Sequence, residues 1–340
     1  MSVGNLRMDL TSDKGLGRKI IRAGLTLTAR IFSGIEGLAF GNAGPALPPL
    51  FIIGLPRGGT TLVYQVLCHS LQVAYTPMLS NSLVFAPSLA AWLSRRRSSH
   101  YSSDFASDYG MSAGLASPGE GGMWNLWFDK DRSYTRLDDL ESWKARQVVR
   151  LIGRTERIGQ GPFLNKNLRH NNRLGVLAGL FPHAVFLVVL RDPRDTAVSL
   201  LQGRIQKEGD PASWYSVKPR SYDRIKNLEP GQSVASQVRE LILDLREDME
   251  TIGLNRFAAI DYQEFCNGPA ATLNRVVEFL KGHGLSLKII QAPPPSFGVS
   301  RNRTGRLTPE QVQAIDASIS ELFADNPLSD MPCQWLTGRN

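Results

Sequence analysis

A short apolar run followed by a glycine-rich turn constrains the fold of this chain more than any other segment. Residues 50–53 are apolar, residues 54–61 read Gly-Leu-Pro-Arg-Gly-Gly-Thr-Thr, and apolar residues at helical spacing follow as far as Leu67. A strand, a loop and a helix in this order are typical of an α/β unit. The segment therefore predicts a strand that ends in a tight loop at the N-terminus of a helix.

The glycines of this loop have the spacing of a phosphate-binding loop. Four residues separate Gly54 from Gly59, as in the Walker A pattern, but Thr60 stands where that pattern has its lysine. Backbone N–H groups in such a loop attract an oxyanion, and Arg57 adds a cation from another position. We therefore expect phosphate binding, but not in the manner of an ATPase. The alternative is a glycine-rich turn with a structural role alone.

A second apolar segment predicts another strand with an anion-binding residue at its end. Residues 184–190 read AVFLVVL, which is typical of a strand that is buried on both faces. Arg191 follows at the carboxyl end, where ligands bind in open α/β sheets. Ser199 lies about two turns into the next predicted helix. An arginine and a hydroxyl suit a phosphate monoester, whereas Arg194 and Asp195 are expected to form a structural salt-bridge cluster.

Further alternation of strands and helices sets the fold class. The pattern predicts a helix, a strand and a helix at residues 233–252, 257–260 and 269–282, the first with Ser233 as its N-cap. We therefore expect an α/β fold, a single P-loop-like domain with a central, mostly parallel sheet flanked by helices on both faces.

The chain also has segments that we expect to lie outside this core. Basic and apolar residues alternate over 14–40, which suits an amphipathic helix that makes weak contact with a membrane, or a helix that packs on its own domain; we favour packing. Two polar stretches are expected to form a lid or acceptor-binding loops. The predicted organisation is an N-terminal helical preamble and linker at 1–49, the domain at 50–325 with these loops at 92–128 and 203–231, and a C-terminal tail at 326–340.

The net charge, the cysteines and the lengths of the apolar segments limit the classes of ligand and the cell compartment that we expect. The 340 residues carry a formal net charge of +8, so the surface favours anions, yet no motif for nucleic acid is present. Cys68, Cys266 and Cys333 have no metal or redox spacing, so no metal is expected, and their odd number suits a reducing compartment. The N-terminus lacks the apolar core of a secretory signal, and residues 184–190 are too few to span a bilayer. We expect a cytoplasmic protein.

The glycine-rich loop and the segment around Arg191 and Ser199 are named the two anchors. Together they resemble the phosphate-binding motifs of PAPS-dependent sulfotransferases of the bacterial type. Residues 55–62 look like the loop that binds the 5′-phosphosulfate of PAPS (3′-phosphoadenosine 5′-phosphosulfate), and residues 189–199 look like the 3′-phosphate motif. Residues 258–265 are similar to the C-terminal part of bacterial members. The resemblance covers about residues 50–310 and implies a P-loop-like fold. It also implies transfer of a sulfuryl group from PAPS to a hydroxyl or amine, with release of PAP.

The resemblance assigns each anchor to one end of the donor. The residues so implied are Arg57, Gly58, Gly59, Thr60, Thr61 and Leu62 for the 5′-phosphosulfate, Arg191 and Ser199 for the 3′-phosphate, and Ser300, Arg301 and Arg303 for a basic loop that closes over it. The basic loop is equally compatible with a solvated turn before a helix at Pro309.

Sulfuryl transfer needs a cation at the departing oxygen and a general base for the acceptor. Arg57 suits the first task, and Lys166 resembles a lysine that other members use there, although a surface lysine is the alternative. Glu120, in a turn-rich loop, is the candidate base. Trp124 and Trp127 beside it either line an acceptor pocket or pack in the core. The other carboxylates considered as the base are Asp104, Asp108 and Asp129.

Two other functions are compatible with the same anchors. One is a P-loop kinase-like phosphotransferase, against which the threonine at position 60 counts, and the other is a non-catalytic nucleotide-binding module. For the sulfotransferase, the long polar loops do not reveal the acceptor. Small molecules such as alcohols or natural-product amines, glycans and lipids are all compatible acceptors.

Overall fold

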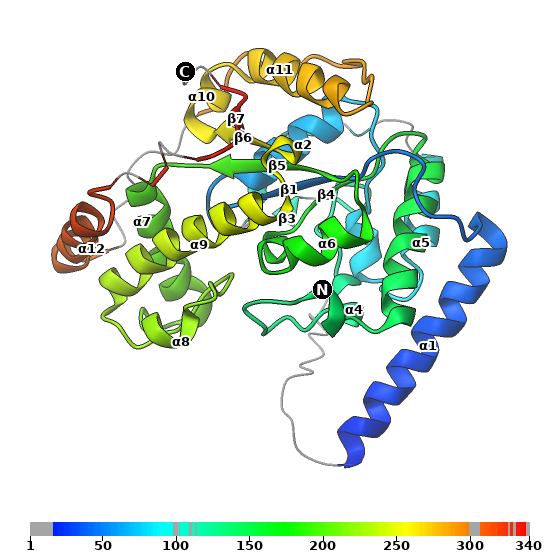
Figure 1. The fold of residues 1–340 in the computed structure, drawn as a ribbon, viewed down its shortest axis with the longest axis horizontal. Helices are drawn as coiled ribbons and strands as arrows, with labels where there is room; N and C mark the ends of the chain where they lie inside the picture. The colour runs from blue at the N-terminus through cyan, green and yellow to red at the C-terminus, as the bar shows by residue number, and fades with distance from the viewer. Residues whose placement is uncertain are drawn as a thin grey trace.

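A five-stranded sheet in which neighbouring strands run parallel forms the centre of the protein (Figure 1). The structure is a computed structural model that describes residues 16–97, 101, 103–108, 111–112, 114–298, 307–325, 327–328 and 331–337. The strand order is β4-β1-β5-β6-β7. The strands are β1 (Leu50–Gly54), β4 (Leu164–Lys166), β5 (Val185–Leu190), β6 (Phe257–Asp261) and β7 (Gln334–Trp335), and a separate antiparallel hairpin joins β2 (Ser107–Asp108) to β3 (Met111–Ser112).

The sheet is covered on both faces, as the predicted fold class requires. Successive residues of β1 point to opposite sides, so Phe51 and Ile53 belong to one hydrophobic cluster and Leu50 and Ile52 to the other. The cluster around Leu50 includes helices α2 (Thr60–Ser70), α10 (Tyr262–Asn267) and α11 (Pro269–Gly282). The cluster around Phe51 includes α4 (Trp124–Trp127), α5 (Ser142–Gly159), α6 (Leu174–Leu180), α7 (Pro193–Gly203), α9 (Pro230–Ile252) and α12 (Pro309–Leu322). The α/β prediction is confirmed.

Adjacent strands β1 and β5 send their helices to opposite faces. Helix α2, which follows β1, packs in the cluster of Leu50, whereas α7, which follows β5, packs in the cluster of Phe51. The connections that follow β1 and β5 diverge, so the carboxyl ends of these two strands form the position at which open α/β sheets bind ligands, here named the crevice. The fold thus places both predicted anchors at one topological switch point.

Several element boundaries differ from the predictions. The long helix begins at Pro230 with Glu229 as its N-cap, not at Ser233, whose hydroxyl is buried and accepts hydrogen bonds from Arg204. Proline at the first helical turn explains the earlier start. The polar stretch 203–231 contains a π-helical turn, Arg204–Glu208, and a short helix, α8 (Tyr222–Ile225).

The region before and around the other polar stretch is also partly helical. Helix α1 (Leu16–Phe40) precedes the sheet, and α3 (Pro87–Arg97) enters the stretch 92–128, which the β2–β3 hairpin and α4 continue. Within the described ranges, no helix is both long and apolar enough to cross a bilayer.

Phe51 lies at the centre of the larger hydrophobic cluster. Its ring stacks on that of Phe186, with the ring centres 5.8 Å apart, and packs edge-on against the His170 ring, with the ring centres 5.3 Å apart. We expect Phe51→Ala to lower the free energy of unfolding by about 3–5 kcal/mol, because truncation removes these contacts and leaves a cavity. Urea denaturation measures the change. Leu254→Ala, at a position that is 41% exposed, is the control and costs less than about 0.5 kcal/mol. A loss below about 1 kcal/mol for Phe51→Ala contradicts the central position of this ring.

Candidate functional site

The glycine-rich loop between β1 and α2 adopts a backbone that an ordinary sequence resists. Arg57 has a φ of 61° and Gly59, the N-cap of α2, has a φ of 88°. A Cβ atom at Gly59 would lie 2.0 Å from the ring of Tyr262, so the position is restricted to glycine by space as well as by φ. The loop closes with a hydrogen bond from the Gly58 N–H to the Leu55 carbonyl at 3.0 Å.

The start of α2 supplies positive potential at the same point. Thr60 and Thr61 form its first turn and are both buried, and Leu62 donates its N–H back to the Gly59 carbonyl at 3.1 Å. The first N–H groups of a helix lack partners within the helix and carry the positive end of its dipole. This geometry suits an oxyanion.

The two sequence anchors, 142 positions apart, meet in the structure. The Arg57 Nε donates a hydrogen bond to the Ser199 Oγ at 3.1 Å, and an Arg191 guanidinium nitrogen donates to the Arg57 carbonyl at 3.3 Å. Arg191 also forms an ion pair with Asp195 at 3.3 Å. Hydrogen bonds therefore join Arg57 of the glycine-rich loop to Arg191 after β5 and to Ser199 of α7.

Arg194, which was predicted to form a salt-bridge cluster with Asp195, pairs with a different residue. Arg194 extends from α7 to Asp316 of α12, with hydrogen bonds of 2.6 and 3.0 Å to the two carboxylate oxygens. These bonds raise the pKa of Arg194. Its role is to attach α12 to α7, while Asp195 binds the other arginine of this segment.

Tyr262 is a site residue for which the sequence reasoning gave no role. It follows the carboxyl end of β6, its ring contacts the Gly59 backbone, and the Arg191 guanidinium lies 5.5 Å from the ring centre. Burial raises the pKa of Tyr262, so its phenol stays protonated. An aromatic residue directly after a parallel strand was the signal available in the sequence, because the strand ends share one edge of the sheet.

The two other predicted catalytic residues form an ion pair. Lys166 is the last residue of β4, paired in register with Ile52 of β1, and its side chain is 2% exposed. Its ammonium group binds the Glu120 carboxylate, whose side chain is 41% exposed. Burial excludes the surface-lysine interpretation. The strand register brings this pair to the same sheet edge as the glycine-rich loop.

A buried polar chain supports the loop that carries Glu120. The Arg173 Nε can only donate, and it lies 3.0 Å from the His170 Nδ1, which must therefore accept. The protonated Nε2 then donates to the Asn165 Oδ1 at 2.8 Å. With its oxygen so engaged, the Asn165 amide donates to the Glu120 carbonyl at 3.4 Å, and Asn167 does so at 3.3 Å. The residues on both sides of Lys166 thus hold the backbone of its partner.

Aromatic packing encloses this chain. The rings of His170 and Trp124 pack edge to face, with their centres 4.7 Å apart. The guanidinium carbon of Arg173 lies 5.1 Å from the centre of the Trp124 ring and 4.5 Å from the centre of the Phe128 ring. Burial lowers the pKa of His170 well below its usual range and lowers that of Arg173 to about 9. Trp124 is 1% exposed and Trp127 donates its indole N–H to Gln147, so both tryptophans pack in the core rather than line an open pocket.

The structure describes only some of the remaining predicted residues. Ser300, Arg301 and Arg303 lie outside the described residues. Of the alternative bases, Asp104 and Asp129 each accept a hydrogen bond from a backbone N–H two residues later in their own loops, and the side chain of Asp108 is not among those described. In the described part of the chain, no three His, Cys, Asp or Glu side chains are grouped to hold a metal ion.

Comparison with known proteins shows the family and the fold of the chain. The profile described as the sulfotransferase family matches residues 48–283, which is more than half of the chain. The chain belongs to this family. Its fold is similar to that of the sulfotransferase STF9 from Mycobacterium avium, with a TM-score of 0.54 and 18% identity over 95% of this chain and 88% of the other.

Curated relatives of this sulfotransferase family member come from mycobacteria. The omega-hydroxy-beta-dihydromenaquinone-9 sulfotransferases Stf3 of Mycobacterium bovis and of Mycobacterium tuberculosis are each 24% identical over 254 residues. The match covers 68% of this chain and spans 62% of the length of each relative.

The neutral, buried His170 makes stability depend on pH. Its pKa is lowered by folding, so below its ordinary value of about 6.5 the unfolded chain takes up a proton that the folded chain does not. We expect this residue to remove up to about 1.4 kcal/mol of stability for each pH unit below that point. The measurement is urea denaturation between pH 7.5 and 5.5. His170→Gln flattens the slope whatever its cost at neutral pH, while His183→Gln, at an exposed position, keeps it. Equal slopes for wild type and His170→Gln exclude the buried neutral state.

Proposed function

We propose that the protein transfers the sulfuryl group of PAPS to a hydroxyl group of an acceptor and releases PAP. The observation that carries the proposal is the hydrogen bond between Arg57 and Ser199, because it joins the two phosphate-binding anchors in one crevice. A ligand with phosphate groups at both ends fits two arginines placed around one helix N-terminus. The absence of a lysine at position 60 favours such a ligand over a nucleoside triphosphate.

In this proposal, each group in the crevice has a separate task. Arg57 and the first turn of α2 bind the 5′-phosphosulfate and stabilise the charge that develops on the departing oxygen. Arg191 and Ser199 bind the 3′-phosphate, and the ring of Tyr262 supports both Arg191 and the loop. Basic residues 301 and 303 are proposed to cover that phosphate.

Glu120 and Lys166 form the part of the site that faces the reacting groups in this proposal. Glu120 accepts the proton of the acceptor hydroxyl as the oxygen attacks sulfur, and Lys166 lies beside the departing oxygen. Their ion pair holds the Glu120 carboxylate beside the Lys166 ammonium group. The chain from Arg173 through His170 to Asn165 holds the backbone of the base in place.

A lipid with a free hydroxyl is the acceptor class that we propose. The two curated relatives are named for a hydroxylated menaquinone, and each matches 254 residues of this chain. We also propose the cytoplasm as the site of action. The free thiols of Cys68, Cys266 and Cys333 support a reducing compartment.

Affinity for PAP tests the donor site. We expect Arg57→Ala and Arg191→Ala each to weaken PAP binding about 10- to 100-fold, because a hydrogen bond to a charged group contributes ~1.5–3 kcal/mol. Isothermal titration calorimetry gives the constants. Arg224→Ala, which removes an exposed arginine that pairs with Glu240, is the matched control and leaves affinity unchanged.

Two outcomes contradict the donor assignment. One is unchanged PAP affinity in both crevice variants. The other is wild-type protein that binds ATP with Mg²⁺ more tightly than PAP, which favours a kinase-like phosphotransferase.

Turnover tests the base. We expect Glu120→Gln to lower the rate at least about 100-fold, as for loss of a general base, while PAP affinity changes by less than about threefold. Product that has gained SO₃ is measured by mass spectrometry with a panel of hydroxylated quinones and lipid extracts as acceptors. Asp104→Asn and Asp129→Asn are the matched carboxylate controls and retain the rate. Near wild-type turnover by Glu120→Gln assigns the base elsewhere.

A further inference from the structure

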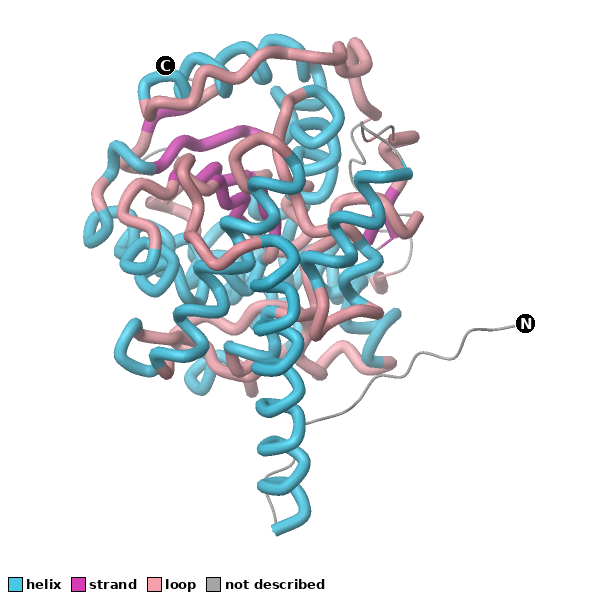
Figure 2. The backbone as a smooth tube through the Cα atoms, turned by 90° about the vertical axis from the view of Figure 1, so that its right-hand side faces the viewer, coloured by secondary structure: helices cyan, strands magenta, loops and turns pink. Residues whose placement is uncertain are grey.

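Helix α1 extends from the body of the protein as a long arm. Figures 1 and 2 show that the end nearer the sheet lies against α5 and α3, while the N-terminal half continues past the other helices. The docked face is marked by Ala29 and Glu36, each 5% exposed. Residues 29, 33, 36 and 40 follow one another at helical spacing and define this face.

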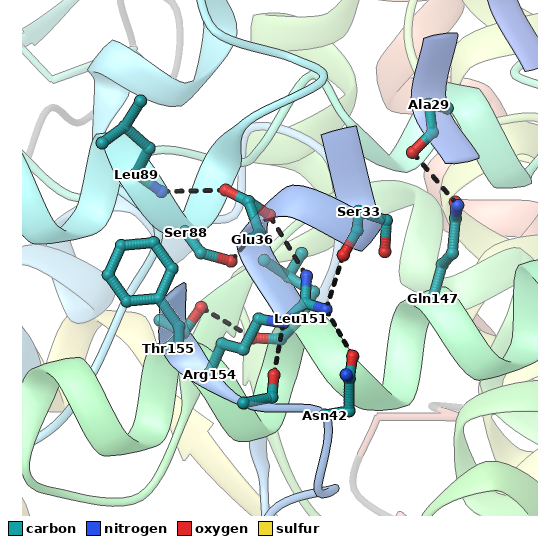
Figure 3. Close-up of polar contacts among 12 residues, drawn as sticks. Ala29, Ser33, Glu36, Asn42, Ser88, Leu89, Gln147, Leu151, Arg154 and Thr155 are labelled. Carbon is teal, nitrogen blue, oxygen red and sulfur yellow. Dashed lines mark hydrogen bonds and ion pairs between the residues drawn. The ribbon is translucent and has the colours of Figure 1, made fainter. Parts of the chain in front are cut away.

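Buried charges fix the helix to the body (Figure 3). The Glu36 carboxylate accepts hydrogen bonds from the Ser88 hydroxyl and the Leu89 N–H, both at 2.9 Å, and lies 3.3 Å from Arg154 of α5. Glu36 is 5% exposed and Arg154 is 1% exposed, and this burial raises the pKa of Glu36 and lowers that of Arg154. Each charge is therefore satisfied by the contact between α1 and the body.

The same arginine fixes the rotation of the helix. Arg154 donates to the Ser33 carbonyl at 2.8 Å, to the Gly41 carbonyl at 2.8 Å and to the Asn42 side chain at 2.9 Å. About two turns earlier on α5, Gln147 donates to the Ala29 carbonyl at 3.3 Å (Figure 3). Because backbone carbonyls of α1 are bound at several levels, the opposite side of the helix has a defined direction.

That opposite side presents a continuous apolar stripe. Its members recur three or four residues apart, about 180° around the helix from the docked face, so they line one edge. They are Leu27, Ile31, Ile35 and Leu38, with exposed fractions of 60%, 53%, 55% and 91%. Single exposed apolar residues are common on protein surfaces, but a contiguous stripe on a projecting helix indicates a binding partner.

The net charge of this segment indicates which partner fits. Residues 14–40 contain one acidic residue, Glu36, and it is buried against Arg154. The basic residues of this segment are Lys14, Arg18, Lys19, Arg22 and Arg30. An apolar edge on a helix of net positive charge matches an anionic lipid surface. A second copy of α1 fits less well, since two such helices repel each other.

We propose that α1 binds the surface of an anionic membrane, with the stripe of Leu27, Ile31, Ile35 and Leu38 inserted between the headgroups. The positive charge of the segment adds electrostatic attraction to the anionic surface. Membrane binding by this surface is a separate property from the proposed transfer reaction. It rests on the proposed reaction in one respect: it would keep the crevice near an acceptor that resides in a bilayer. The Arg154 contacts hold the bound enzyme in one orientation.

Vesicle co-sedimentation of the full chain tests the proposal. The probes are vesicles of phosphatidylcholine with roughly 30% phosphatidylglycerol and vesicles of phosphatidylcholine alone. We expect the protein to bind the anionic vesicles, and we expect added salt to weaken this binding. Binding to the neutral vesicles is expected to be weaker than binding to the anionic ones. Ile31→Ser with Ile35→Ser lowers the partition coefficient at least about 10-fold, because the inserted apolar area is lost. Leu254→Ser with Ile290→Ser, at positions 41% and 42% exposed, is the matched control and binds like wild type.

The affinity for PAP separates this proposal from the reaction. PAP binding stays unchanged in both double variants, so failure of the donor site leaves the vesicle result interpretable. Three outcomes overturn the proposal: wild type that does not bind anionic vesicles, binding that survives Ile31→Ser with Ile35→Ser, and a dimer in sedimentation equilibrium that these substitutions dissociate without any vesicle binding. The last outcome assigns the stripe to a second copy of the chain.

Discussion

The parallel pairing of β1 with β5 is the constraint on which the site depends. Their register matches Leu50 with Val185 and Gly54 with Val189, so both strands end at the same level. A Cβ atom at Gly54 would lie 2.1 Å from the Val189 carbonyl oxygen, so this close approach requires glycine. With the strand ends level and their helices on opposite faces, segments distant in sequence share a single crevice.

The sequence predicted those parts of the protein whose signals are local. The strand at 184–190 is apolar throughout and the loop at 54–61 has its own glycine spacing, so both anchors and the fold class followed from short windows. Strand β4 was missed because it is three residues long and contains Asn165 and Lys166, which are polar types in a fully buried strand. Its stability comes from the neighbouring β1 rather than from its own pattern.

The support behind Glu120 could not have been predicted for a related reason. It depends on the tautomer of His170, which Arg173 sets, and on an amide orientation that follows from that tautomer. Each of these residues has an ordinary solvated role in most proteins. Their function here arises from mutual contact in the interior, where a partly satisfied polar chain would be costly. The same holds for Glu36 and Arg154, whose charges lie on helices more than a hundred residues apart.

The geometry of Arg57 has a consequence for how the two halves of the crevice respond to change. Its side chain is bound to α7 through Ser199, and its carbonyl is bound by Arg191 at the end of β5. Arg57 therefore connects α7 and the end of β5 to the glycine-rich loop through these two hydrogen bonds. Substitutions on the two sides are thermodynamically coupled, so their combined effect differs from the sum of the separate ones. The two anchors therefore respond to substitution as one unit rather than as two independent sites.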